Sequence, residues 1–201
     1  MVLQLEEALF IGQGDWKRCY RHPVNKDQCV KVVYRKGGER EQLIELSYRE
    51  LLAKRKVDTR VLPRYFGTVE TNLGTGYIYE TVLDSDGSVS KSLEHFVKNK
   101  ELLDANFAML VGVLKKLKLD LWQTGIVILG YSMVNIFIQN NCGQYEARII
   151  DNIGSKDLLP LEYYLSYFAR TRLERKWKRF TRRILRDYPD DTRARFVEQI
   201  Q

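Results

Sequence analysis

The hydrophobic pattern of the chain changes between its first and second parts, and this change limits the folds open to it. In the first part, short alternating and β-branched runs are separated by turns rich in Gly, Pro and Asn, which is typical of an antiparallel sheet. In the second part, longer segments have helical periodicity. The sequence therefore predicts an α+β protein with a β-rich lobe at residues 1–83, a reduced helical lobe at residues 84–201 and a cleft between them.

The expected elements follow this division. In the first lobe we expect three strands between Leu9 and Tyr34, a helix from Glu39 to Arg55 and a strand in TGYIYETVL. Leucines are expected on related faces of that helix: Leu43, Leu46, and Leu51 or Leu52. In the second lobe we expect helices at residues 93–99 and 101–123, the longer one ending near Gly125, then strands around residues 126–129, 135–139 and 146–151, and a helical tail from Leu158.

Composition places the chain among globular proteins without a metal or disulfide framework. Its 201 residues are 44% hydrophobic and 29% charged, which is enough for a buried core. The three cysteines form no CxxC pair and the two histidines stand apart from acidic clusters, which argues against a catalytic zinc site. Cys19 and Cys29 can pair only if adjacent strands bring them together. Because the start lacks a basic leader and no apolar run approaches the roughly 18 residues of a membrane span, a cytoplasmic protein is expected.

Three segments of the first lobe carry residues that suit phosphate chemistry. Gly12 and Gly14 lie between two expected strands, where glycine lets backbone N–H groups approach a phosphate. Lys31 interrupts an apolar strand, where a buried ammonium needs an anionic partner, and Glu45 on the following helix is a candidate for that partner. Other acidic residues of the helix compete for this role: Glu41 and Glu50. Each feature also has an ordinary interpretation, as turn glycines, a solvent-facing lysine and an exposed carboxylate.

Two oxygen-bearing side chains of the second lobe complete the pattern. Asn135 and Asp151 each border a short apolar strand. Oxygen ligands in such positions suit Mg²⁺, although turn formation also explains them. The order of glycine loop, strand lysine, helix glutamate, asparagine and aspartate matches the protein-kinase signature set. This order, rather than any single residue, predicts a nucleotide site.

On these residues the chain resembles a known family, the YrbL-like proteins of the bacterial PhoP regulatory network, a group with a protein-kinase-like fold. The similar segments, from about Ile11 to Arg179, are CYRHP, CVKVVY, LPRYFGTVET, GTGYIYE, VNI, IDNIG, LLPL and ERKWKRF. The resemblance implies a small bilobal kinase-like fold that binds ATP and Mg²⁺. The implied site residues are Gly12 and Gly14 over the phosphates, Lys31 paired with Glu45, Glu80 to Val82 as the hinge facing adenine, Tyr79 behind that pocket, and Asn135 and Asp151 as metal ligands.

The expected catalytic segment departs from the kinase pattern at its centre. In kinases an aspartate five positions before the asparagine accepts the substrate proton, and here that position is Gly130. Lys17 stands where a third loop glycine is expected, and the metal motif reads Asp151-Asn152-Ile153-Gly154. A general base contributes about 10²- to 10⁴-fold to a rate. We therefore expect a nucleotide-binding pseudokinase or regulatory protein with weak or no phosphotransfer.

Two alternatives stay open. One is an active atypical kinase acting on a small molecule, a sugar or a lipopolysaccharide-type substrate, because only 50 residues follow Asp151 and they leave little room for a peptide-docking platform. The other is an adaptor that binds no nucleotide and uses a basic helix to hold an acidic partner.

The positive charge of the chain is concentrated in the segment Arg170–Arg186. This segment holds nine Lys or Arg and one Glu, whereas the remainder carries 24 positive and 25 negative residues. Apolar residues recur within it at helical spacing and are expected to pack on the domain: Leu173, Trp177, Phe180 and Ile184. Its basic face is a solvated surface, or a docking surface for acidic protein, anionic lipid or lipopolysaccharide phosphates, with nucleic acid the least favoured partner. The residues proposed for docking are Arg175, Lys178, Arg179 and Arg182.

Overall fold

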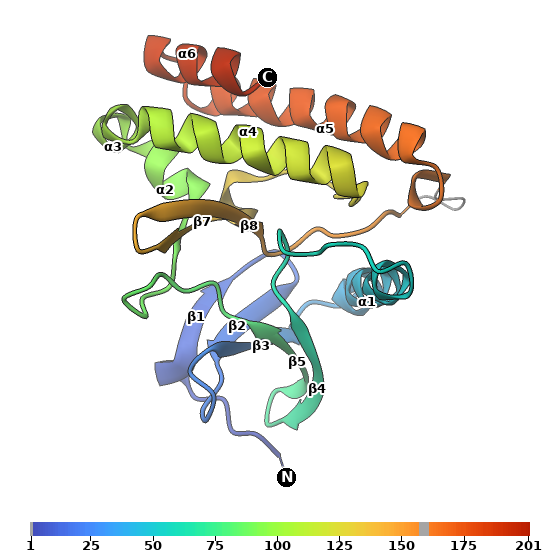
Figure 1. The fold of residues 1–201 in the computed structure, drawn as a ribbon. Helices are drawn as coiled ribbons and strands as arrows, with labels where there is room; N and C mark the ends of the chain where they lie inside the picture. The colour runs from blue at the N-terminus through green and yellow to red at the C-terminus, as the bar shows by residue number, and fades with distance from the viewer. Residues whose placement is uncertain (1, 157–160) are drawn as a thin grey trace.

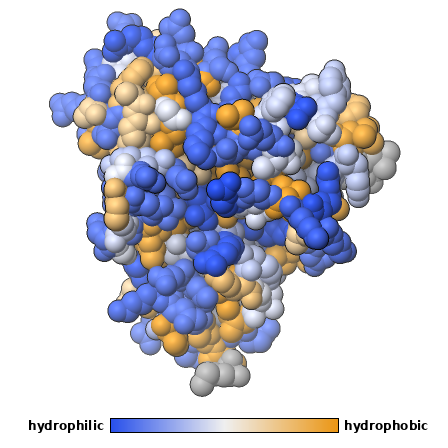
Figure 2. All heavy atoms as spheres, in the orientation of Figure 1, coloured by the Kyte–Doolittle hydropathy of each residue, from blue (hydrophilic) through white to orange (hydrophobic). Residues whose placement is uncertain are grey.

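The structure, a computed structural model, describes residues 2–156 and 161–201. It is a mixed α+β protein with a β-sheet at one end and most of its helices at the other (Figure 1). A short β-hairpin lies between the two, and helix α1 lies beside the sheet. The N-terminus is at the sheet end and the C-terminus at the helical end. Hydrophilic side chains cover most of the face in Figure 2, and hydrophobic ones form small separate groups.

The sheet at the N-terminal end is antiparallel and has five strands in the order β1-β2-β3-β5-β4. Its elements are η1 (Glu7–Leu9), β1 (Phe10–Gln13), β2 (Lys17–Arg21), β3 (Gln28–Val33), β4 (Tyr65–Thr71) and β5 (Gly74–Glu80), with α1 (Gly38–Lys54) inserted between β3 and β4. The three strands, the helix and the following strand expected from the sequence are confirmed within a few residues. Cys19 on β2 and Cys29 on β3 are free thiols on two paired strands.

The C-terminal part of the chain combines a small sheet with a layer of helices. Its elements are β6 (Lys91–Ser92), α2 (Leu93–Lys98), α3 (Lys100–Ala105), α4 (Phe107–Thr124), η2 (Met133–Asn135), β7 (Ile136–Asn141), β8 (Gln144–Ile149), η3 (Leu161–Tyr163), α5 (Ser166–Asp187) and α6 (Asp191–Ile200). The small sheet is antiparallel in the order β6-β7-β8. Gly125 ends α4 in the left-handed conformation, with φ 69°, as its position after the apolar pattern predicts.

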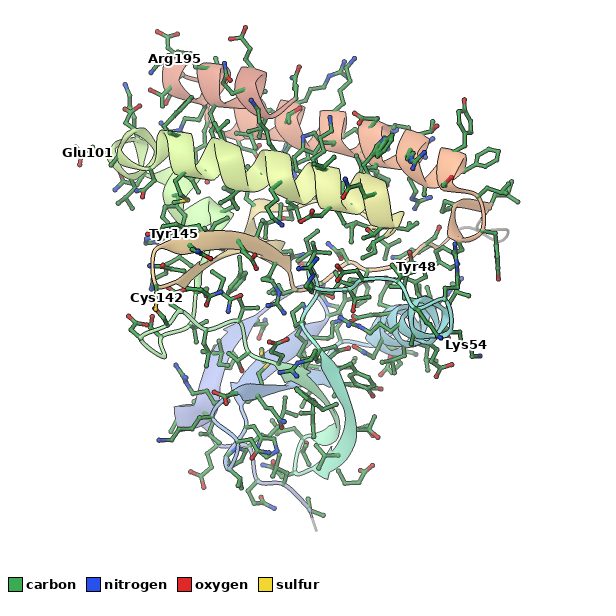
Figure 3. The ribbon with its side chains drawn as sticks, viewed as in Figure 1. Tyr48, Lys54, Glu101, Cys142, Tyr145 and Arg195 are labelled. Carbon is green, nitrogen blue, oxygen red and sulfur yellow. The ribbon has the colours of Figure 1, made fainter. Side chains whose placement is uncertain are left out.

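Two hydrophobic cores divide the molecule, and α1 belongs to the larger one. The small core lies on one face of the five-stranded sheet and contains Leu5, Tyr20, Val30 and Val32. The large core fills the helical part and also includes Tyr48 and Leu52 of α1. Tyr48 lies on the side of α1 toward the helices (Figure 3), and its hydroxyl accepts a hydrogen bond of 2.9 Å from the Val127 N–H. The helix therefore connects the sheet to the helical layer.

Three expectations from the sequence differ from the structure. The long helix predicted for residues 101–123 is broken at Asn106, whose side chain donates 2.8 Å to the Leu102 carbonyl and so ends α3. Residues 126–129 form only an isolated bridge between Ile128 and Ile153. On α1, Leu43 is 61% exposed, and the buried positions are Gly38, Gln42, Glu45, Tyr48 and Leu52. The helical tail predicted from Leu158 begins outside the described residues, and α5 and α6 occupy its remainder.

The amphipathic prediction for the basic segment is confirmed. Leu173, Trp177, Phe180 and Ile184 of α5 are all buried in the large core. Among the described residues, no helix is both long and apolar enough to cross a membrane.

Gly76 provides a test of packing between the strands. A Cβ at this buried position on β5 would stand 2.5 Å from Val30 Cγ1 and 2.9 Å from Thr71 Cγ2. We expect Gly76→Ala to lower the free energy of unfolding by about 1–3 kcal/mol, because side chains must shift to admit the methyl group. Urea denaturation measures this change.

Gly112 on α4 is the matched control, because a Cβ there meets no atom within 4 Å. We expect Gly112→Ala to be neutral or to stabilise by up to about 1 kcal/mol, since alanine is the better helix former. Equal losses in both variants would contradict the packing at Gly76.

Candidate functional site

The centre of the candidate site is the side chain of Lys17, the first residue of β2. Its ammonium is 2.8 Å from Asp151 Oδ1, 3.2 Å from Gln42 Oε1 and 3.5 Å from Glu45 Oε2. Lys17 is 7% exposed and Glu45 is 2% exposed. A buried ammonium is stable only when charged or hydrogen-bonding partners replace its water. Here one lysine joins the sheet, α1 and the segment after β8.

The pKa of Lys17 shows which partners dominate. Burial alone lowers the pKa of an ammonium, but the negative charges of Asp151 and Glu45 outweigh burial and raise it above its ordinary value. Lys17 is therefore positively charged at neutral pH, and it holds two carboxylates from different parts of the chain.

The prediction that Lys31 forms an ion pair with Glu45 is wrong. Glu45 contacts Lys17 and, at 2.9 Å, Arg49. The strand register explains the difference, because Lys17 lies opposite Val33, at the end of β3 that leads into α1, whereas Lys31 lies opposite Cys19. Lys17 is therefore beside the early turns of α1, where Glu45 is located.

Lys31 instead contacts the backbone before Asp151. Its ammonium donates a hydrogen bond of 2.6 Å to the Ile150 carbonyl and lies 4.8 Å from the ring centre of Tyr79. The Tyr79 hydroxyl accepts 2.6 Å from Gln42 Nε2, and burial followed by the Glu45 charge raises the pKa of this phenol. The two lysines thus approach the Ile150–Asp151 segment from neighbouring strands.

Asp151 carries the negative charge on the helical side of the site. Burial raises the pKa of its carboxyl, but Lys17 and Lys31 outweigh burial, and the pKa lies below its usual value. The side chain is 30% exposed, so water reaches it. Asp151 is therefore an ionised carboxylate at neutral pH, paired with Lys17 and favoured by the nearby charge of Lys31.

Asn135 lies opposite Ile150, the residue before Asp151, because of the hairpin register. Ile136 on β7 pairs with Ile149 on β8, and the Ile150 N–H donates 3.0 Å to the Asn135 carbonyl. Mg²⁺ in nucleotide sites commonly takes one or two protein oxygens and completes its shell with phosphate and water. Asn135 and Asp151 fit that number and kind of ligand, although Lys17 occupies one Asp151 oxygen. Within the described ranges, no group of three or more His, Cys, Asp or Glu is arranged to hold a metal.

Gly130 lies near this pair and has room for a side chain. The Asn152 side chain donates 3.4 Å to the Gly130 carbonyl, and a Cβ built on Gly130 meets nothing within 4 Å. The position that lacks the kinase aspartate therefore has room for a Cβ atom.

The expected hinge residues connect the two parts of the molecule. Glu80 Oε2 accepts 2.9 Å from Arg148 on β8 and 2.9 Å from the Arg64 N–H. Val82 is buried, and its carbonyl accepts 3.0 Å from the Ser90 N–H. The side chain of Glu80 thus makes an ion pair between the sheet and the hairpin.

The expected glycine loop lies at the edge of the site. Gly12 on β1 and Gly14 after it are not among the glycines with positive φ. The Gly14 N–H donates 2.9 Å to the Lys17 carbonyl, and a Cβ on Gly12 meets nothing within 4 Å. Neither glycine is required by its backbone conformation.

The space at the centre of the site is small. A cavity of about 20 Å³ lies against Lys17, Glu45 and Asp151, which holds about one water molecule. A phosphate group is larger than this cavity, so its entry would require side chains of the cluster to move.

Three residues of the cluster were not predicted from the sequence: Lys17, Gln42 and Arg49. In the sequence, Lys17 stands out only as a departure from the glycine pattern. It lies two residues before Cys19 and so on the same face of the strand. Cys19 in turn pairs with Lys31. Gln42 lies three residues before Glu45, on the same helix face, which is a signal that helical spacing provides.

The pH dependence of stability tests the Asp151 cluster. Because its folded pKa is lowered, Asp151 contributes stability above its unfolded pKa of about 3.9, and that stability is lost as the pH falls through the folded value. At pH 7 we expect Asp151→Asn to lower the free energy of unfolding by about 1–3 kcal/mol. The difference from the native chain should shrink between about pH 4 and pH 2, measured by urea denaturation.

Asp27→Asn is the control, because Asp27 is an exposed turn residue. We expect it to change stability by less than about 0.5 kcal/mol at every pH. A difference for Asp151→Asn that stays constant down to pH 2 would contradict the ionised cluster.

Comparison with known proteins places the chain in a family. Residues 3–185 match the family described as "PhoP regulatory network protein YrbL". A protein of Escherichia coli (strain K12), "Uncharacterized protein YrbL", is 35% identical over 182 residues, covering 89% of this chain and 86% of that protein. A protein of the same name from Shigella flexneri matches to the same extent. The chain therefore belongs to the YrbL family of PhoP regulatory network proteins.

Proposed function

We propose that this protein is a nucleotide-binding regulatory protein of protein-kinase-like fold with weak or no phosphotransfer. One observation carries the proposal: the buried ammonium of Lys17 lies between Glu45 of α1 and Asp151 after β8. Protein kinases hold a lysine of the sheet against a glutamate of the adjacent helix, opposite a metal-binding aspartate. The same three kinds of charge meet in this chain.

The order of the elements supports the kinase-like interpretation. A sheet of five antiparallel strands carries one helix between its third and fourth strands, and a short connection leads into a helical part with a β-hairpin. In kinases these elements hold the nucleotide between the sheet and the hairpin. The proposed ligands of ATP and Mg²⁺ lie on these same elements.

We assign the phosphate-binding role to Lys17 in place of Lys31. Lys17 contacts both carboxylates, whereas Lys31 donates to the Ile150 carbonyl and so supports the backbone before Asp151. Asn135 and Asp151 would hold Mg²⁺, and Glu80 to Val82 would face the adenine. When bound, Mg²⁺ would neutralise phosphate charge.

The same geometry accounts for weak transfer. A nucleotide requires Asp151 to release Lys17, and this exchange costs part of the binding free energy. Gly130 provides no proton acceptor where kinases have an aspartate. Binding is therefore the expected activity, and turnover is expected to be slower than in kinases by about 10²- to 10⁴-fold.

Thermal unfolding with nucleotide tests the binding proposal. At MgATP about ten times its dissociation constant, mass action stabilises the folded state by about 1.4 kcal/mol, which raises Tm by about 3–6 °C in a protein of this size. We expect Lys17→Met to abolish this shift relative to its own ligand-free Tm, because the phosphate partner is lost. Lys31→Met should retain part of the shift.

Lys116→Met is the control, since Lys116 is exposed and pairs with Asp120 on α4, away from the site. It should leave the shift unchanged. The absence of any shift in the native chain would refute nucleotide binding. Loss in Lys31→Met with retention in Lys17→Met would refute the assignment of the lysines.

Gly130→Asp tests the proposed catalytic segment. Because a side chain has room there, we expect a carboxylate to restore a proton acceptor and to raise ATP turnover by about tenfold or more, within the range of general-base effects. Release of labelled phosphate from ATP measures the rate.

Gly130→Asn is the matched variant, because it has the same shape and no proton acceptor. It should stay at the native rate. An equal change in both variants would attribute the effect to shape rather than to proton transfer.

A further inference from the structure

A second concave site lies on the other side of Gly130, against helix α5. It is a groove of about 380 Å³ lined by Gly130, Tyr131, Lys176, Arg179, Phe180, Arg182, Arg183 and Arg186. We call it the basic groove. Its volume is within the range of small-molecule sites, about 300–1,000 Å³. It is a hollow between a turn and a helix, and so differs from a flat charged face.

The basic groove is lined by five cationic side chains and by no acidic one. The buried Phe180 forms its floor, and Arg183 donates a hydrogen bond to the Tyr131 carbonyl. Arg186 pairs with Asp187 at 2.8 Å. Arg179 and Arg182 are exposed, and within the described ranges neither makes an ion pair or a side-chain hydrogen bond. These two guanidinium groups are therefore available to a ligand.

Like charges held side by side repel one another, and a multiply charged anion relieves that repulsion. Guanidinium groups present paired N–H donors that match the oxygens of a phosphate. The neighbouring arginines sit on a helix that is anchored in the large core by Trp177 and Phe180. The donors are thus held near one another before a ligand arrives.

We propose that the basic groove binds a phosphate-bearing small molecule, with Arg179 and Arg182 as its principal ligands. A free phosphorylated compound and the phosphate of a lipid headgroup share this chemistry. The proposal does not depend on nucleotide binding, because none of these arginines contacts Lys17, Glu45 or Asp151.

The position of the groove relates it to the candidate nucleotide site. Gly130 lines the groove, and its carbonyl accepts a hydrogen bond from Asn152, the residue after Asp151. A phosphorylated ligand in the groove would therefore lie beside the segment that holds Asp151. A phosphate site beside a nucleotide site would suit a phosphorylated molecule that either accepts the transferred phosphoryl group or regulates the protein.

Calorimetric titration with inorganic tripolyphosphate tests the proposal. We expect the native chain to bind it, and the double variant Arg179→Gln/Arg182→Gln to bind at least about tenfold more weakly. The matched double variant Arg175→Gln/Lys178→Gln removes the same charge from exposed positions of α5 outside the groove. It should change the affinity by less than about threefold.

Three further measurements define the ligand. Citrate, which also carries several negative charges at pH 7, should bind at least about tenfold more weakly than tripolyphosphate. The double variant Arg179→Gln/Arg182→Gln should keep the full rise in Tm that MgATP produces in the native chain, which separates the groove from the nucleotide site. Sedimentation with phosphatidylcholine vesicles containing phosphatidic acid identifies the source: binding that requires Arg179 and Arg182 assigns a lipid headgroup, and its absence assigns a free compound.

Other outcomes would overturn the proposal. These are no binding by the native chain, equal losses in the two double variants, citrate binding as tight as tripolyphosphate, or tighter binding of polyglutamate, which would indicate an acidic protein partner. Both double variants change only exposed side chains, so circular dichroism should show that each is folded.

Discussion

The charged contact of Lys17 is the interaction on which the arrangement of the molecule depends. It joins a strand, a helix and the segment after the β7–β8 hairpin through one ammonium group. Buried ion pairs rarely add large net stability, but removal of one partner is costly because a charge is left without compensation. The main effect of the cluster is therefore to specify which parts of the chain come together. Its contribution to the stability of the fold is smaller.

Other contacts across the same boundary are polar and directional. Lys31 donates to the Ile150 carbonyl, Arg148 pairs with Glu80, and the Tyr48 hydroxyl accepts from Val127. The apolar packing of α1 against the helical layer comes from Tyr48 and Leu52. The relative position of the sheet and the helices is thus set by a few hydrogen bonds and one helix. Such contacts have a single good geometry, whereas apolar packing tolerates small displacements.

The order of the elements was predictable from the sequence because periodicity and turn residues are local. The strands before Tyr34, the helix at α1 and the stop at Gly125 follow from residues near one another in the chain. The break at Asn106 was missed because its side-chain hydrogen bond competes with a strong helical pattern. The buried face of α1 was missed because its inward residues, Gln42 and Glu45, are polar. Contacts with Lys17, Tyr79 and Arg49 compensate for the burial of these polar groups.

The kinds of residue in the charged cluster were predictable from the sequence, but the pairs that they form were not. The Asn135 carbonyl and the Lys31 ammonium both hydrogen-bond to the backbone of Ile150, the residue before Asp151. The choice of Lys17 over Lys31 as the partner of Glu45 depends on strand register relative to α1, which spacing along the chain does not give. Metal and nucleotide binding by these residues remain predictions.

The two roles proposed for Asp151 would have a thermodynamic consequence for the whole molecule. The carboxylate that would bind a divalent cation also holds the ammonium that links the sheet to the hairpin. Occupancy by a cation and closure of that link would therefore oppose each other, and by linkage each would weaken the other by the same factor. A cation that arrives without phosphates would loosen the molecule, whereas one that arrives with phosphates would supply a new anion for Lys17 and hold the two parts together again.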